Sequence, residues 1–451
     1  MRTMLATLLG LALVTSSDGC NRRAPAGSPW TRWGIAKPTT GPDAEAKLTE
    51  AHRLFYVQKF DSAASLYREL VESFPQSAEA HLGLSLACRY LGQRDTALTE
   101  ARVAFGLDSE AVGVLLNYAN LMLPMRTGPL ADMSDSARYA ESERCLLKAA
   151  ASNHPFNAHA HIELWASYMG QGRLTDARRQ AAELGRKHYY AQPLLDFAHN
   201  LLAGLDTNAI LFTSGDNDTY PLWVLQNSGA PFRPDVTVAN LSLLNIRSVV
   251  RMMRDSLGLP LSFTDKEIDS LAPRLGATGL ELPAHQVIEN LLALKPGAGR
   301  PVYFAATVKS EITDRYADRL VLEGLVNRVT ESGSAAPVPV DRISENLTQR
   351  YRLDWPEPLP PWPQNMSPLT RKVAPLAANY ANAYARLASL YDSLGRQADA
   401  ANAWPEAVAW MKRSGKDDAV RSLVEEWNRC LPDDARARKM KAELEKNVKA
   451  Q

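Results

Sequence analysis

Small residues recur at a fixed spacing in the first half of this 451-residue chain, and this period constrains the fold more than any other sequence feature. Ala63 and Ala97 are 34 positions apart, and so are Tyr67 and Ala101. Gly92 stands five residues before Ala97, where a turn between two helices is expected. A period of this length is typical of stacked antiparallel helix pairs, in which small side chains let neighbouring helices approach closely. The spacing therefore predicts a helical-repeat protein.

The same design returns further along the chain. Gly172 precedes the small residue Ala177 by five positions, and Gly395 precedes Ala400 by the same interval. An insertion around residues 124–134 splits one repeat between the first and the later units. The chain therefore carries more than one block of repeats.

These units resemble the tetratricopeptide-repeat family over about residues 45–190 and 375–440. We place the two blocks of helical repeats at residues 44–205 and 371–451. The resemblance implies a curved helical stack whose concave face binds a protein or peptide partner. The alternative is that the helices only pack against the domain between them and act as a scaffold.

Residues 1–20 have the features of a secretory signal peptide. Residues 4–14 form an apolar run that is too short to cross a bilayer. The position of Cys20 resembles a bacterial lipoprotein signal, in which this cysteine becomes the lipidated N-terminus, although Ser17 and Asp18 depart from the usual pattern. The alternative is that Cys20 is lost with the signal or left free after ordinary cleavage.

These features predict an exported protein that is periplasmic or lipid-anchored to the cell envelope. Residues 21–43 are rich in Gly, Pro, Ser and Thr, which is typical of a flexible tether. No later stretch has about eighteen consecutive apolar residues, so the sequence predicts no transmembrane span in the mature chain.

Charge and cysteine content exclude several classes of protein. Lys and Arg number 51 and Asp and Glu number 50, and a formal net charge of +1 gives no field that would attract nucleic acid. Cys88, Cys145 and Cys430 do not make a disulfide framework, although one pair could form in an oxidising compartment. Their spacing from histidines is not that of a zinc site.

In residues 206–330 the sequence pattern changes from repeating helices to alternating strands and helices. The predicted strands are Ile210–Thr213, Val236–Leu241 and Val302–Thr307, and the predicted helices are Ile246–Leu257 and Arg315–Arg328. This alternation predicts a small α/β domain with a parallel or mixed sheet. A Pro-rich linker is expected over residues 331–370. The expected fold class is α plus α/β, with helical repeats flanking the α/β domain.

Polar side chains follow each predicted strand. Ligands of α/β sheets bind outside the carboxyl ends of the strands, so we expect the three loops to meet there. The ligand-binding candidates are Asp216, Asn217, Asp218 and Tyr220 after the first strand, and Asn240, Asn245 and Arg247 after the second. Thr307, Lys309 and Glu311 follow the third strand.

Asp216 and Asp218 are the candidate metal ligands, because carboxylate oxygens on a tight loop suit a divalent cation. Many sugar-nucleotide transferases hold a metal ion on such an Asp-x-Asp loop. A divalent cation is therefore the one cofactor that the sequence suggests. The alternative is that both carboxylates shape a turn and complement the positive end of the following helix.

The middle domain resembles the soluble C-terminal tail of a bacterial family of polytopic membrane proteins. The resemblance is carried by the runs GDNDTYPLWVLQ, RPDVTVANLSLLN, RPVYFAATV and LEGLVNRV, in this order over about residues 207–330. The membrane part of that family is similar to protein O-mannosyltransferases. It has no counterpart in this sequence, so the resemblance does not extend sugar transfer to this chain. It does suggest an association with glycan or glycoprotein handling.

No established catalytic motif occurs in the chain. The sequence has no Gly-x-Ser-x-Gly elbow, no Gly-Lys-Ser/Thr phosphate loop and no HExxH pair, and His285 is expected near the start of a helix. We therefore expect an interaction or scaffold protein rather than an enzyme. The alternative is an enzyme or a sugar- or metal-binding module centred on the Asp216–Asn217–Asp218 loop.

Overall fold

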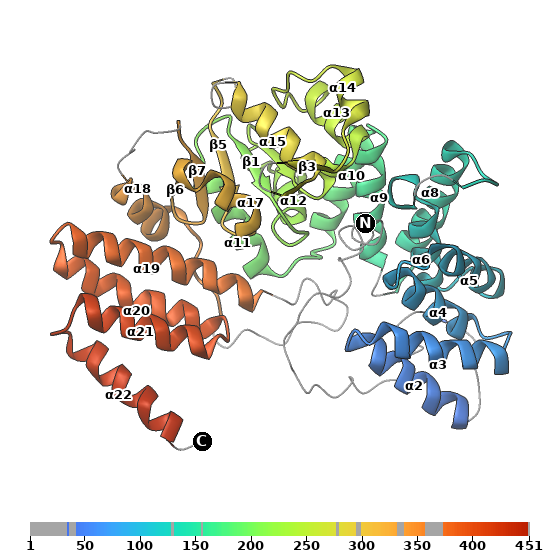
Figure 1. Ribbon diagram of the computed structural model, residues 1–451, viewed down its shortest axis with the longest axis horizontal. Coiled ribbons are helices and arrows are strands. Elements are labelled where there is room, and N and C mark those ends of the chain that lie inside the picture. The colour runs from blue at the N-terminus through green and yellow to red at the C-terminus, as the bar shows by residue number, and fades with distance from the viewer. Residues whose placement is uncertain are drawn as a thin grey trace. The chain divides into compact units, whose positions relative to one another are not determined.

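The computed structural model describes residues 34–35, 42–127, 130–154, 157–276, 279–294, 299–331, 338–356 and 373–449 (Figure 1). The expected signal peptide with Cys20 and most of the expected tether lie outside these residues. So do residues 332–337 and 357–370 of the expected linker. The chain divides after Tyr189 into two compact units. The first unit contains the early helices, and the second contains the sheet and the C-terminal helices.

The first unit consists of helices that pack in sequence order. Its helices are α2 (Pro42–Tyr56), α3 (Phe60–Ser73), α4 (Ala78–Tyr90), α5 (Arg94–Leu107), α6 (Val112–Met122), α7 (Pro124–Thr127), α8 (Asp135–Ala151), α9 (Asn157–Gly170) and α10 (Leu174–Arg186). From α2 to α6 each helix contacts the next, and α8, α9 and α10 continue the series (Figure 1). The short α7 lies in the insertion that splits one repeat. The predicted helical repeats are confirmed.

One turn geometry joins the two helices of the pairs α4–α5 and α9–α10. Gly92 and Gly172 both have a φ of +73°, a left-handed conformation that costs glycine little. After Gly92, the amide of Gln93 donates to the carbonyl oxygen of Cys88 at 2.9 Å, which closes the end of α4. The first pair makes the same turn with Gln58 at a φ of +63°. A glycine at the turn therefore indicates this connection, but the connection also forms without a glycine.

Small residues allow close packing within the first unit, as the period predicts. Ala63, Ala97 and Ala177 are fully buried. Gly83 on α4 faces the ring of Tyr67 on α3, where a Cβ atom would lie 2.2 Å from a ring carbon. The absence of a side chain at this position therefore sets how closely α3 and α4 approach.

We expect Gly83→Ala to destabilise the protein. Overpacking costs about 1–3 kcal/mol, which exceeds the gain of up to about 1 kcal/mol from replacing glycine within a helix. Gly106→Ala on α5 is the matched control, because its Cβ would meet nothing within 4 Å. The control should gain up to about 1 kcal/mol. Urea unfolding of both variants measures the difference, and equal stabilisation of both would show that Tyr67 is free to move.

The second unit contains a five-stranded mixed sheet with the order β2-β1-β5-β7-β6. Its strands are β1 (Ile210–Thr213), β2 (Thr237–Asn240), β5 (Val302–Ala305), β6 (Leu320–Leu322) and β7 (Val326–Val329). β1 pairs with β2 and β5 in parallel, whereas β7 pairs antiparallel with β5 and with β6. All the residues of β1 and β5 are buried, which explains their unbroken apolar sequences. The predicted α plus α/β class and the three predicted strands are confirmed.

The predicted helix Arg315–Arg328 is wrong. A 3-10 helix spans Asp314–Arg319, and β6 and β7 follow as a hairpin. Gly324 in the hairpin turn has a φ of +95°, and a Cβ atom there would lie 2.6 Å from the hydroxyl of Tyr351. The apolar residues of the hairpin recur at intervals that also fit a helix, so periodicity alone did not distinguish the two.

A second hairpin, β3 (Arg274–Gly276) with β4 (Gly279–Glu281), was not predicted. Leu275 and Leu280 face each other across it and are 84% and 42% exposed. Because the hairpin has no buried face, it leaves no alternating pattern in the sequence.

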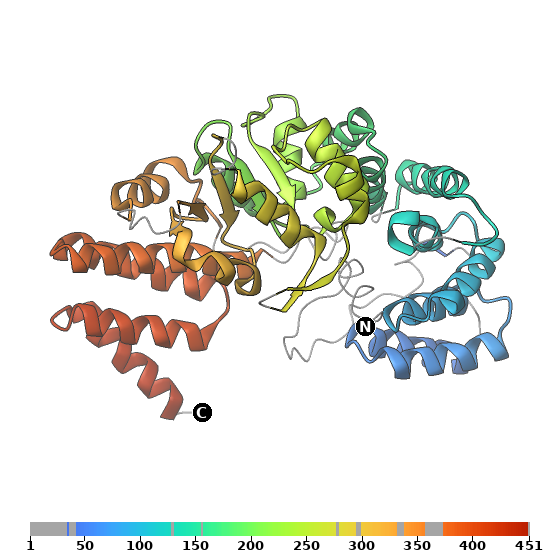
Figure 2. The same cartoon turned by 45° about the horizontal axis from the view of Figure 1, so that its top comes forward.

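Helices surround the sheet and continue to the C-terminus. The helices next to the strands are α11 (Gln192–Ala203), α12 (Tyr220–Asn227), α13 (Arg247–Asp255), α14 (Asp265–Ser270), α15 (Pro283–Ala293) and α17 (Ser310–Thr313). The C-terminal helices are α19 (Ala377–Ser393), α20 (Gln397–Arg413), α21 (Asp417–Cys430) and α22 (Ala435–Lys449). Figures 1 and 2 show α19, α20 and α21 as successive layers with α22 at the end of the stack.

Part of the expected linker is folded. Within residues 338–356, α18 (Val340–Glu345) leads into a π-helical turn at Asn346–Arg350. Ile343, Leu347 and Tyr351 recur every four residues and are buried, and Trp355 is buried after them. Helical spacing of large apolar residues therefore outweighs the flanking prolines here.

Asn200 on α11 joins three segments of the second unit. Its side-chain amide donates to the carbonyl oxygen of Arg352 at 2.9 Å and to the hydroxyl of Tyr380 at 2.8 Å. Its side-chain oxygen accepts from the Arg352 amide at 2.7 Å. Asn200 is fully buried, so these bonds are made without competition from water. They fix α11, the segment after α18 and α19 to one another.

A charged cluster connects α18 to the segment after α11 and to the sheet. Arg342 on α18 lies 2.7 Å from Asp206 after α11 and 2.7 Å from Glu323 in the β6–β7 turn. The hydroxyl of Tyr303 on β5 also donates to Asp206, at 2.9 Å. Burial opposes ionisation of Asp206, but the hydrogen bonds from Arg342 and Tyr303 outweigh it and lower the pKa of this carboxyl.

Two further findings concern the whole described chain. No described helix is both long and apolar enough to cross a membrane. Cys88, Cys145 and Cys430 are free thiols, and the first two are buried. The pairing of two cysteines considered from the sequence is therefore not present.

Candidate functional site

The carboxyl ends of β1, β2 and β5 carry the loops that the sequence analysis singled out. Because these strands are parallel neighbours, their loops emerge at one edge of the sheet. The Thr307 hydroxyl after β5 donates to Asp218 in the loop after β1. Asn240 at the end of β2 donates to the hydroxyl of Thr219 at 2.9 Å. The three loops therefore meet, as expected.

Asp218 organises the loop after β1. One of its oxygens accepts from the Gly215 amide at 2.6 Å, and the other accepts from the Ser214 amide at 3.1 Å and from the Thr307 hydroxyl. The residue is 3% exposed. Burial raises the pKa of Asp218 above its ordinary value, and the hydrogen bonds from Thr307 and the two amides act against this rise. Both oxygens are thus used to hold the loop.

Asp216 and Asn217 differ from Asp218 in exposure, because both are only half-buried. The main-chain carbonyl oxygen of Asp216 accepts from the Tyr220 amide at 3.0 Å, which begins α12. Tyr220 is buried and packs edge-on against Trp223. Asp216 and Asn217, like Ser214 in the same loop, therefore keep some access to solvent.

The candidates after β2 hold the neighbouring backbone. The side-chain oxygen of Asn240 accepts from the Leu243 amide at 3.0 Å. Asn245 donates to the Leu241 carbonyl oxygen at 3.1 Å, and its oxygen accepts from the Ala284 amide at 3.2 Å. Arg247 donates to the Leu271 carbonyl oxygen at 2.9 Å. These contacts pin the loop after β2 to α15 and to the segment after α14.

The sequence analysis missed the part played by threonines. Thr219 occupies the N-cap position of α12, but it makes no side-chain cap hydrogen bond. Its hydroxyl donates to the Gly215 carbonyl oxygen at 2.6 Å and lies 2.7 Å from the hydroxyl of Thr213. Both threonines are fully buried. The sequence signal was Thr213, a threonine at the end of an otherwise apolar strand. Its hydroxyl needs a hydrogen-bond partner when it is buried.

His285 lies in the first turn of α15, as expected. Its Nδ1 atom accepts from the Leu282 amide at 3.0 Å, which satisfies one free amide at the helix start. Burial and the nearby positive charge of Arg315 lower the pKa of His285. This contact accounts for its position without a catalytic role.

Metal ligands are sparse in the part of the chain that the structure describes. There, no group of three or more His, Cys, Asp or Glu side chains is placed to hold a metal ion. Asp216 and Asp218 alone would supply two carboxylates. The oxygens of Asp218 already accept hydrogen bonds from Ser214, Gly215 and Thr307. Binding of a divalent cation at this loop stays a prediction.

These features define a helical-repeat protein whose second unit combines a small mixed α/β domain with further helices. Residues 194–273 match the protein family described as TMEM260-associated domain 2. The matched segment begins in α11 and includes β1, β2 and both of their loops. It fits a TMEM260-like tail, in agreement with the resemblance of the middle domain to the tail of a membrane-protein family. A comparison with curated proteins found no match for the chain.

We expect Asp218→Ala to destabilise the second unit by about 2–4 kcal/mol, because the Ser214 and Gly215 amides lose their acceptor. Asp216→Ala is the matched control on the same loop and should cost less than about 1 kcal/mol. Chemical denaturation of both variants gives the comparison. An equal loss of unfolding free energy in both variants would mean that Asp218 does not hold the loop.

Proposed function

We propose that the protein is an interaction scaffold whose helical repeats, of the tetratricopeptide kind, hold a protein or peptide partner. The observation that carries the proposal is the recurrence of one helix–turn–helix geometry along the first unit. Gly92 and Gly172 share the same φ, and each is followed five residues later by a fully buried alanine. A stack built from such units presents the first helices of the pairs side by side, which is how repeat proteins form extended binding surfaces.

The helical repeats would then bring their partner to the second unit. The match to TMEM260-associated domain 2 supports the resemblance of the middle domain to the tail of a membrane-protein family. Because the membrane part of that family is similar to O-mannosyltransferases, the resemblance suggests a role near glycan or glycoprotein handling. This step is an association between domains and not a mechanism.

The scaffold would be exported and held at the cell envelope. The apolar run of residues 4–14 followed by Cys20 supports this proposal. In a bacterial host with lipoprotein processing, radiolabelled palmitate should enter the wild-type protein and not Cys20→Ser. Label in both proteins, or in neither, would remove Cys20 as the anchor.

The partner proposal is tested by affinity capture from an envelope extract. Residues 42–189, residues 190–449 and the whole chain are used as separate baits, after circular dichroism has shown that each is folded. We expect the first fragment to retain the same partner as the whole chain, because it contains the complete first unit. Retention by the whole chain alone, or by the second fragment alone, would show that the early repeats are mainly structural.

A sugar- or metal-binding module at the loop after β1 is the second candidate function. It is favoured by the half-exposed Asp216 and Asn217 at the edge where three strand ends meet. Mg²⁺, Mn²⁺ or Ca²⁺ should then raise the melting temperature of the wild type and not that of Asp216→Ala. No shift with any of these ions would remove the metal-binding form of this candidate.

A further inference from the structure

The last described helix, α22, differs in charge from the helices on which it stacks. It carries six Lys or Arg residues and two Glu residues. In α19 and in α20 the two signs are equal in number, and α21 has four Asp or Glu residues and two Arg residues. The excess positive charge of these four helices therefore lies on α22.

One side of α22 packs on α21 (Figure 1). Ala437 is fully buried, and its carbonyl oxygen accepts from the Asn428 side chain of α21 at 3.0 Å. The guanidinium group of Arg436 pairs with Asp434 at 2.8 Å and lies 5.8 Å from the ring centre of Trp427. These contacts fix the rotation of α22 about its own axis, so they also determine which of its residues face away from α21.

Three exposed basic residues share the side of α22 that faces away from α21: Arg438, Lys439 and Lys446. At about 100° per residue, they lie in a sector about 100° wide, which is nearly opposite Ala437 and Leu444. Glu443 and Glu445 flank this sector and do not lie within it. The outer side of α22 therefore carries positive charge alone.

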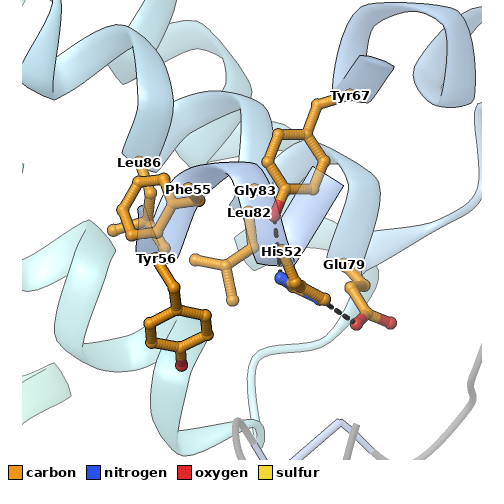
Figure 3. A pocket seen from close by; sticks show the side chains of 8 residues that line it. All are labelled: His52, Phe55, Tyr56, Tyr67, Glu79, Leu82, Gly83 and Leu86. Carbon is orange, nitrogen blue, oxygen red and sulfur yellow. Dashed lines mark hydrogen bonds and ion pairs between the residues drawn. The ribbon is translucent and has the colours of Figure 1, made fainter. Parts of the chain in front are cut away.

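Several titratable side chains of the first unit, in contrast, have partners within the protein. In the interior, His52 lies 2.8 Å from the Tyr67 hydroxyl and 3.1 Å from a carboxyl oxygen of Glu79 (Figure 3). At the surface of α10, the exposed Arg186 lies 2.5 Å from Glu183. Such pairing reduces the charge that a helix offers to an external ligand.

The basic residues on the outer side of α22 have no such ion pairs. Within the described residues, no ion pair or hydrogen bond joins the side chain of Lys439 or Lys446 to another group. Arg438 donates to the main-chain carbonyl oxygen of Asp433 at 3.1 Å, and this contact is not an ion pair. All three charges are therefore available to a ligand outside the protein.

The arrangement suits the headgroups of an anionic bilayer. A Lys or Arg residue close to such a surface strengthens binding about fivefold without requiring a defined geometry. Lysine ammonium groups are point charges on flexible stems, whereas recognition of a single phosphate or carboxylate relies on the fixed fork of arginine. A formal net charge of +1 gives the whole chain no field that would attract nucleic acid.

We propose that the outer side of α22, formed by Arg438, Lys439 and Lys446, binds the anionic headgroups of a phospholipid bilayer. This contact goes beyond the proposed function, because it requires neither a partner on the repeats nor a lipid on Cys20. Since the opposite side of α22 packs on α21, the contact is electrostatic and does not insert the helix among the acyl chains. Salt should therefore weaken it, because charges are screened over about 10 Å at 0.1 M ionic strength.

The test is co-sedimentation with vesicles at low ionic strength. Residues 21–451, which keep every described residue, are mixed with vesicles of phosphatidylglycerol and phosphatidylcholine in equal parts. The wild type should bind these vesicles and not vesicles of phosphatidylcholine alone. Changing Arg438, Lys439 and Lys446 together to Gln should raise the lipid concentration for half binding about a hundredfold, since each residue contributes about fivefold.

The matched control removes the same number of charges from one helix of the first unit. Arg178, Arg179 and Arg186 of α10 are changed together to Gln, because all three are exposed and two of them pair with carboxylates. This variant should bind the anionic vesicles as the wild type does. An equal loss of binding in both variants would show that only the total charge matters, and would overturn the assignment to α22.

Two further results would overturn the proposal. One is a wild type that does not bind the anionic vesicles, or that binds phosphatidylcholine vesicles equally well. The other is tighter binding, through the same three residues, to double-stranded DNA at the same phosphate concentration. Because residues 21–451 lack Cys20 and no partner protein is present, failure of this test leaves the scaffold function and the lipidation of Cys20 to their own experiments.

Discussion

The hydrogen bonds of Asn200 are the interaction on which the second unit depends most. A single buried side chain satisfies both main-chain groups of Arg352 and the hydroxyl of Tyr380, which lie 152 and 180 residues further along the chain. Without Asn200 the fully buried hydroxyl of Tyr380 would lose its hydrogen bond in the interior, and that gives the arrangement a steep energetic preference. The C-terminal helices are therefore part of the same folded body as the sheet, and not a separate block attached by a linker.

The parallel strands could be predicted from the sequence and the antiparallel edge could not. β1 and β5 are short, unbroken apolar runs, and only a strand covered on both faces requires such a sequence. The turn of the β6–β7 hairpin contains Gly324, which lies against Tyr351, and the amide of Leu325 donates to the Tyr351 hydroxyl, 26 residues further along the chain. Contacts at that separation leave no local pattern, so the helical spacing of the same residues was misleading.

The location of the candidate site was predictable, but the roles of its residues were not. Parallel topology brings the strand ends together, so the loops of Asp218, Asn240 and Thr307 had to meet. Which of the two aspartates points inward is decided by two amides of the same loop and by Thr307 on another loop, and no spacing encodes this choice.

The left-handed turn repeats with little variation, at +73° in Gly92, Gly172 and Gly415 and at +72° in Gly395. Because every such joint leaves the chain in the same direction, a whole helix pair can be gained or lost by gene duplication or deletion without disturbing the joints on either side. Part of a unit cannot be gained or lost in this way, since one helix would then lack the helix with which it pairs. The length of the first stack can therefore evolve in steps of one helix pair.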